Sequence, residues 1–215
     1  MKPSTREKIA DLIARYPALA PCEDDMTRAV EAIVGSYARG GKVLTCGNGG
    51  SAADSEHIVG ELMKGFLKHR PLGEEMREAL KKVAPERAEY IANGLQGALP
   101  AVSLIGALAL NTAFANDQAP DLSMAQQVLG LGVRGDILLG ISTSGNSKNV
   151  VYAIDVAKAK GLTTIALTGE TGGRLKAIAD ICICAPSRET YKIQEYHLPI
   201  YHMLCIAAEN EFFDE

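Results

Sequence analysis

The chain has 215 residues, which at about 150 residues per domain predicts one large domain with a substantial core. Its 22 Lys and Arg residues against 26 Asp and Glu residues give a net charge of -4, and these charges are scattered along the chain. A protein that binds nucleic acid by neutralising phosphates is therefore not expected. The 21 glycines exceed the roughly 7% of an average protein and predict several tight loops.

The cysteines are odd in number and have no CxxC spacing, which predicts reduced thiols in the core rather than a disulfide framework. They are Cys22, Cys46, Cys182, Cys184 and Cys205. The most apolar stretch, 99–115, is interrupted by polar residues and is shorter than the roughly 20 residues that span a bilayer. The charged N-terminus lacks the apolar segment of a signal peptide. We therefore expect a soluble cytoplasmic protein with no membrane partner.

Apolar periodicity predicts two helices, over about 4–16 and 23–39, before the first strand. Short apolar runs then predict five strands, at 42–46, 101–105, 136–142, 163–167 and 180–185. Helices are expected over about 52–68, 149–160 and 189–213. Alternating strands and helices are typical of an α/β fold, here a doubly wound parallel sheet of five strands with helices on both faces.

Segment 73–97 disturbs this alternation. It is charged, helix-prone and broken by Pro85, so we interpret it as a helical insertion between the first two strands. Its charges could form a solvated face or a lid that contacts a ligand, and we favour the solvated face.

Two glycine-rich loops follow strands and lead into helices, where anions bind to backbone N–H groups. The second loop supplies four hydroxyls in six residues, which favours a phosphate site over an ordinary capped turn. Its residues are Ser142, Thr143, Ser144, Gly145, Asn146 and Ser147. The first loop, 47–51, can be matched to a dinucleotide pattern, but the second strand carries no acidic residue and no Gly-Lys-Ser/Thr follows, so no nucleotide cofactor is expected. We expect Ser51 to cap the helix that follows this loop.

Two pairs of polar residues could share a site. His57 and Glu61 are four apart and lie on one helix face, expected near the carboxyl edge of the sheet. Gln194 and His202 are eight apart, about 80° round a helix, so they could converge on the same pocket. Together they could bind zinc, or the carboxylate and an imidazole could act as base and acid on a sugar. Spacing alone also allows an ordinary surface pair, while His197, about 140° round the helix from His202, should face elsewhere.

Three runs identify a resemblance to a family: CGNGGSAADSEHIVGEL at 46–62, LLGISTSGNSKNV at 138–150 and IQEYHLPIYH at 193–202. The chain resembles the sugar isomerase (SIS) domain family, most closely the phosphoheptose isomerases. The resemblance implies a flavodoxin-like fold, with 1–215 as a single SIS domain. It also implies an aldose-ketose isomerase that interconverts sedoheptulose 7-phosphate and D-glycero-D-manno-heptose 7-phosphate through an enediol.

The resemblance assigns roles to individual residues. Glu61 and His202 match the acid-base pair, and zinc-bound relatives use the positions of His57, Glu61, Gln194 and His202. The residues expected to bind phosphate or the rest of the substrate are Asn48, Gly49, Gly50, Ser51, Asn116, Asp117, Ser142, Thr143, Ser144, Ser147 and Gln194. Homotetramers with active sites shared between subunits are also implied, with helices in 1–40 serving assembly. Gly65 departs from the family, which commonly has an arginine there, and Lys64 and Lys68 are possible substitutes.

Two other functions compete with catalysis of heptose isomerisation, besides isomerisation of a different phosphosugar. One is a non-catalytic SIS protein that binds a protein partner, like the relative that associates with the bacterial replication initiator. That relative lacks the matching Glu and His, so Glu61 and His202 favour an enzyme. The other is a sugar-phosphate sensor in a transcription regulator, which needs a DNA-binding domain, whereas 1–41 predicts two helices without a basic recognition face.

Overall fold

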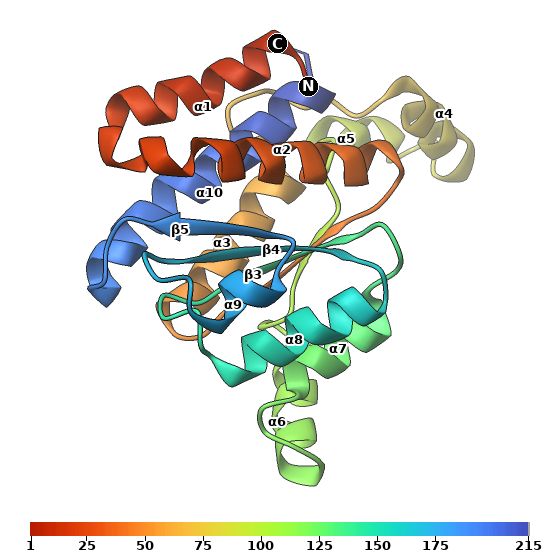
Figure 1. Cartoon of the computed structure of the whole chain (residues 1–215). Helices are drawn as coiled ribbons and strands as arrows, with labels where there is room; N and C mark the ends of the chain where they lie inside the picture. The colour runs from red at the N-terminus through yellow and green to blue at the C-terminus, as the bar shows by residue number, and fades with distance from the viewer. Residues whose placement is uncertain (215) are drawn as a thin grey trace.

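A computed structural model describes residues 1–214 and contains one parallel sheet of five strands. The strand order is β2-β1-β3-β4-β5, the flavodoxin-like order, which confirms the predicted fold class (Figure 1). All five strands lie where the sequence predicts them. Their bounds are β1 Val43–Cys46, β2 Ala101–Ser103, β3 Ile137–Ile141, β4 Thr163–Gly169 and β5 Ile181–Ala185.

Alternate residues of the central strands face two separate apolar cores, one on each side of the sheet. Val43 belongs to the core formed with α1, α2, α3 and α10, whereas Leu44 belongs to the core formed with α7, α8 and α9. In register, Val43 lies opposite Ile137 and Leu44 opposite Leu138. The continuous apolar runs of these strands follow from burial on both faces.

The first core is covered by helices from the two ends of the chain (Figure 1). The bounds are α1 Pro3–Arg15, a 3₁₀ helix η1 Pro17–Cys22, α2 Glu23–Ala38, α3 Gly50–Met63 and α10 Thr190–Phe212. Asn210 of α10 donates its amide N–H groups to the hydroxyls of Ser4 and Thr5 at 2.8 and 2.9 Å, which fixes α1 on α10.

Helix α3 is shorter than predicted, because Lys64 leaves the helical conformation with φ -136° and ψ 172°. The opposite face of the sheet carries α7 Ser123–Leu131, α8 Lys148–Ala159 and α9 Gly173–Ile178. Helix α6, Leu108–Asp117, projects below these helices and buries no residue (Figure 1). The sequence analysis predicted α8 but not α6, α7 or α9, which are short.

The segment expected to be a helical insertion contains α4, Glu74–Val83, and α5, Ala88–Gly94. These two helices pack on each other and project from the body of the molecule (Figure 1). Helix α4 buries none of its residues, in agreement with a solvated face. All five cysteines are free, and four of them are buried, as predicted. Within 1–214, no helix has the length and apolar character needed to cross a membrane.

Candidate active site

Both glycine-rich loops lie at the carboxyl edge of the sheet, after the neighbouring strands β1 and β3. The side chains of Asn48 and Asn149 join them through two reciprocal amide hydrogen bonds of 3.0 and 2.8 Å. The two loops therefore form one continuous surface at the position where doubly wound sheets bind ligands.

The second loop, which we call the hydroxyl loop (Ser142–Ser147), has a backbone that depends on glycine. Gly145 has φ +65°, and a Cβ there would lie 2.0 Å from the carbonyl oxygen of Gly172. Ser147 occupies the N-cap position of α8 but makes no capping bond, and its hydroxyl lies 2.9 Å from that of Ser142. The two hydroxyls therefore bond to each other and not to the backbone N–H groups of the helix, and whether they bind an anion stays a prediction of the sequence.

A cavity of about 260 Å³ opens beside the hydroxyl loop. Thr143 and Ser144 line one side of it, and Ser187 and Arg188 line another. The Arg188 guanidinium is paired with Glu170 at 2.5 Å, so most of the donors for an anion here are hydroxyls and backbone N–H groups.

The first loop differs from expectation at its helix start. Gly49, with φ +56°, is the N-cap of α3, and Ser51 is a buried residue inside the helix, so the prediction that Ser51 caps α3 is wrong. Because Gly49 has a positive φ, it lies just outside the helix. Helix α3 therefore begins at Gly50, before the predicted start at about residue 52. A Cβ at Gly50 would lie 2.3 Å from Nε2 of Gln194, so the Gln194 amide packs directly on the first turn of α3.

Further along the same two helices, the structure brings together a group that we call the acid-base cluster: His57, Glu61 and His202. His57 Nε2 lies 3.1 Å from Glu61 Oε1, and the rings of His57 and His202 are 5.0 Å apart, edge to face. Lys64 donates to Glu61 Oε2 at 2.8 Å. Within the described chain, Nε2 of His202 is buried and has no hydrogen-bond partner.

The electrostatics of the cluster keep the carboxylate charged and the imidazole neutral. Partial burial raises the pKa of Glu61, but hydrogen bonds and charge from Lys64 and His57 outweigh it, so the pKa lies below the ordinary carboxyl value. Burial, together with the charge of His57, lowers the pKa of His202, against a smaller opposing effect of Glu61. Near neutral pH the pair is therefore an ionised base beside an uncharged imidazole.

The acid-base cluster does not lie at the carboxyl edge, where the sequence placed it. Glu61 is eleven residues beyond Gly50, or about 16 Å along α3. Similarly, Gln194 lies about 12 Å along α10 from His202, at the level of Gly50. The structure therefore brings His57, Glu61 and His202 together and leaves Gln194 with the loops.

Asn116 and Asp117 lie at the end of α6, where Asn116 donates to the Asp117 carboxylate at 2.8 Å and both are exposed. His197 faces away from the cluster, as predicted, and its Nε2 lies 3.1 Å from the carbonyl oxygen of Thr168. In the described residues, no set of three or more His, Cys, Asp or Glu side chains is arranged to hold a metal ion.

Comparison with known proteins agrees with the fold. The SIS domain family matches two overlapping segments, 7–93 and 86–169. The phosphoheptose isomerase of Akkermansia muciniphila is 34% identical over 208 residues, which cover 97% of this chain and 96% of the relative. The phosphoheptose isomerase of Thiobacillus denitrificans is 40% identical over 196 residues, which cover 90% of this chain and 85% of the relative.

Solved structures give the same result. The phosphoheptose isomerase of Neisseria gonorrhoeae superposes with a TM-score of 0.72 at 32% identity, covering 95% of this chain and 98% of the other. The phosphoheptose isomerase of Francisella tularensis superposes with a TM-score of 0.73 at 31% identity, covering 94% of this chain and 93% of the other. The chain belongs to the phosphoheptose isomerase family of SIS-domain proteins.

The departure from the phosphoheptose isomerase pattern at Gly65 lies next to the acid-base cluster. Of the two lysines considered as substitutes for that arginine, Lys64 donates to Glu61, whereas Lys68 donates to the backbone carbonyl of Phe213. Sequence analysis missed Tyr201, whose hydroxyl lies 2.9 Å from His57 Nδ1. Its only sequence signal was its place beside His202 in the third family motif.

Proposed function

We propose that this protein is a phosphosugar aldose-ketose isomerase that interconverts sedoheptulose 7-phosphate and D-glycero-D-manno-heptose 7-phosphate. The observation that carries the proposal is the cluster of Glu61, His57 and His202 on α3 and α10, with 3.1 Å between Glu61 and His57 and 5.0 Å between the two imidazole rings, in a chain of the phosphoheptose isomerase family. Isomerisation requires one proton to move between neighbouring carbons and another between their oxygens. A carboxylate and a neutral imidazole are suited to these two transfers.

In the direction from ketose to aldose, Glu61 takes a proton from C1 and returns it to C2. His202 accepts the proton of the C1 hydroxyl and passes it to the C2 oxygen, so that all protons balance through an enediol. The unpartnered, buried Nε2 of His202 supports this role, because a nitrogen already bonded to protein would be less available to the sugar. The hydroxyl loop, through Ser142, Thr143, Ser144 and Ser147, would hold the phosphate with backbone N–H groups.

Proton NMR in deuterated water tests the reaction. Sedoheptulose 7-phosphate is incubated with the zinc-supplemented protein, and the expected product is the aldose with solvent deuterium at C2. Deuterium at C2 would establish proton transfer through an enediol, because the proton on Glu61 can exchange with water before it is returned; aldose without deuterium would show transfer from C1 to C2 without exchange. Absence of any product from folded protein, followed by a negative panel of pentose and hexose phosphates, would favour the partner-binding SIS protein.

We also propose that the active site is shared between subunits of a homotetramer. Support comes from the separation of about 16 Å along α3 between Gly50, beside the hydroxyl loop, and Glu61. At substrate concentrations far below KM, where loss of affinity and loss of turnover both lower the rate, mixing Ser144→Ala and Glu61→Gln after dissociation and reassembly should restore about a quarter of the wild-type activity if each site takes its loop and its base from different subunits. No recovery in verified mixed oligomers would place both groups of a site on one chain.

We propose that Zn²⁺ binds to His57, Glu61 and His202; Gln194, the fourth ligand that the resemblance implies, lies about 12 Å along α10 from His202 and is left out of this site. Two imidazoles and a carboxylate are ligands that zinc prefers, and zinc bound to Nε2 of His202 would compete with proton transfer for the same lone pair. His57 and Glu61 bond to each other, so a metal would have to replace that hydrogen bond. Bound zinc would polarise the sugar carbonyl. Competition with a zinc-sensitive dye should give at least tenfold weaker binding for His57→Ala, whereas Gln194→Ala is the control and should leave the affinity unchanged; unchanged affinity in His57→Ala would exclude this site.

We propose a cytoplasmic location, supported by five free cysteines, which suit a reducing compartment. Titration of thiols in denaturant without reductant should find all five in protein purified from its own cells.

A further inference from the structure

The most deeply buried cation of the described chain lies close behind the acid-base cluster. The side chain of Arg70 is fully buried, although it lies in the segment between α3 and α4. Its Nε donates to Glu209 Oε1 at 2.9 Å, and its Nη1 and Nη2 donate to the carbonyl oxygens of Leu62 and Glu61 at 2.7 and 3.2 Å. The guanidinium thus caps the last turn of α3, whose final carbonyls lack helical partners.

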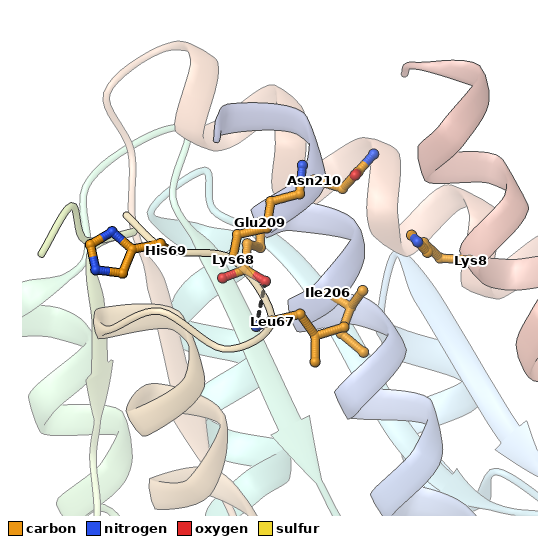
Figure 2. A pocket seen from close by; sticks show the side chains of 7 residues that line it. All are labelled: Lys8, Leu67, Lys68, His69, Ile206, Glu209 and Asn210. Atoms are coloured by element: carbon orange, nitrogen blue, oxygen red, sulfur yellow. Dashed lines mark hydrogen bonds between the residues drawn. The ribbon is translucent and has the colours of Figure 1, made fainter. Parts of the chain in front are cut away.

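Glu209 is the other half of this ion pair and is 1% exposed. Its two carboxylate oxygens accept the backbone N–H groups of Phe66 and Leu67 at 2.8 and 2.9 Å. Figure 2 shows the bond to Leu67 and the chain of 67–69 crossing beside α10. Burial raises the pKa of Glu209, but these backbone donors and Arg70 outweigh it, so the pKa lies below its usual value and the pair is ionised.

The pair connects the two elements that carry the acid-base cluster. Arg70 holds the carbonyl of Glu61 itself, on α3. Glu209 lies seven residues after His202 on α10, about 20° round the helix, so both residues face α3. Any change in the ion pair would therefore alter how the end of α3 lies against α10, and with it the spacing between Glu61 and His202.

We propose that Arg70 and Glu209 are positioning residues that set the placement of the Glu61 carboxylate relative to His202. This inference rests on the proposed isomerase function. Removing one partner of a buried pair is expected to destabilise the fold, so stability alone cannot test the role. A displacement of about 1 Å in a catalytic group can lower turnover about a hundredfold. A fall in kcat of the folded protein therefore indicates a positioning role, which a loss of stability alone does not.

Two variants test whether Arg70 and Glu209 position the Glu61 carboxylate. Arg70→Lys keeps the charge but cannot reach Glu209 and both carbonyls at once. Arg70→Met/Glu209→Gln removes both charges together and keeps an amide oxygen for the N–H groups of Phe66 and Leu67. The matched control is Asp136→Asn, which weakens another ion pair with a buried carboxylate, the one with Lys42 where β1 and β3 begin. Melting temperature, kcat, KM and hydrogen exchange are measured for each.

For both Arg70 variants we expect kcat to fall about tenfold to a hundredfold, with KM changed less than about threefold. Asp136→Asn should lower the melting temperature while kcat stays at the wild-type level. The inference is overturned if the Arg70 variants retain the wild-type kcat, or if kcat falls equally in Asp136→Asn at the same loss of melting temperature.

If the wild-type protein isomerises no phosphosugar, the proposed function has failed, and hydrogen exchange decides whether the pair positions the end of α3. Faster exchange in peptides covering 61–67, with unchanged exchange in 142–150, supports the positioning. Unchanged exchange in 61–67 overturns it.

Discussion

The hydroxyl loop and the acid-base cluster are built by different means. The loop is a short local segment whose shape depends on backbone conformation, with Gly145 pressed against the carbonyl of Gly172. The cluster is made of side chains on two helices, and its contacts join residues far apart in sequence, such as His57 and Tyr201, 144 positions apart. His57 and Lys64 are also 42% and 57% exposed. Changes in the loop should therefore alter affinity, and changes in the cluster should alter turnover.

The largest expected effect is on turnover. Glu61→Gln should lower kcat at least about a hundredfold, because the amide cannot accept the carbon-bound proton, while the dissociation constant for the phosphosugar stays within about threefold. Calorimetry and initial rates measure the two quantities. Glu56→Gln, an exposed carboxylate one turn earlier on α3, is the matched control and should leave both unchanged. A strong loss of affinity in Glu61→Gln would contradict the expectation that the hydroxyl loop sets affinity and the acid-base cluster sets turnover.

The next effect is on binding. Gly145→Ala should weaken the affinity for the phosphosugar by tens of fold, because its Cβ would meet a backbone oxygen at a positive φ. Gly49→Ala has a similar φ of +56° but meets nothing within 4 Å, so its loss should be clearly smaller. Equal affinities in the two variants would show that contact with Gly172 does not shape the loop.

The loop side should also carry an acid-sensitive element. Burial lowers the pKa of His197 to about 4, against an ordinary value of 6.5, while its Nε2–H donates to Thr168 behind the loop. Since the folded pKa is depressed, stability is fully present above pH 6.5 and is lost as the pH falls towards 4, by up to about 3 kcal/mol. Urea unfolding between pH 7.5 and 4.5 measures this slope, and His197→Gln should flatten it. An equally steep slope in that variant would assign the acid sensitivity to other groups.

The smallest effect concerns Lys64. Its ammonium helps to hold the pKa of Glu61 below the ordinary value, so Lys64→Met should raise that pKa and leave less of the carboxylate ionised at pH 5. The ratio of kcat/KM at pH 5 to that at pH 7.5 should fall about twofold to threefold relative to wild type. A ratio equal to wild type would show that His57 alone keeps Glu61 ionised.

Local patterns predict the loop side better than the cluster side. The five strands and the hydroxyl loop could be found because short apolar runs, glycines and hydroxyls define them within a few residues. The early end of α3 could not be predicted, because it depends on Glu209, which binds the backbone of Phe66 and Leu67 from 143 and 142 positions away. For the same reason, spacing on α10 did not show that Gln194 packs on Gly50.

The central place of β1 in the sheet has a consequence for how the chain acquires its structure. β1 pairs with β2 and with β3, whose residues 137–140 follow Val43–Cys46 by 94 positions. During synthesis both edges of β1 emerge long before β3, its second neighbour, and unpaired strand edges favour aggregation. Parallel pairing across such distances is also slow. Among the inner strands, β1 thus waits longest along the chain for its second neighbour, and it is paired on both edges only when residues up to position 140 have been made.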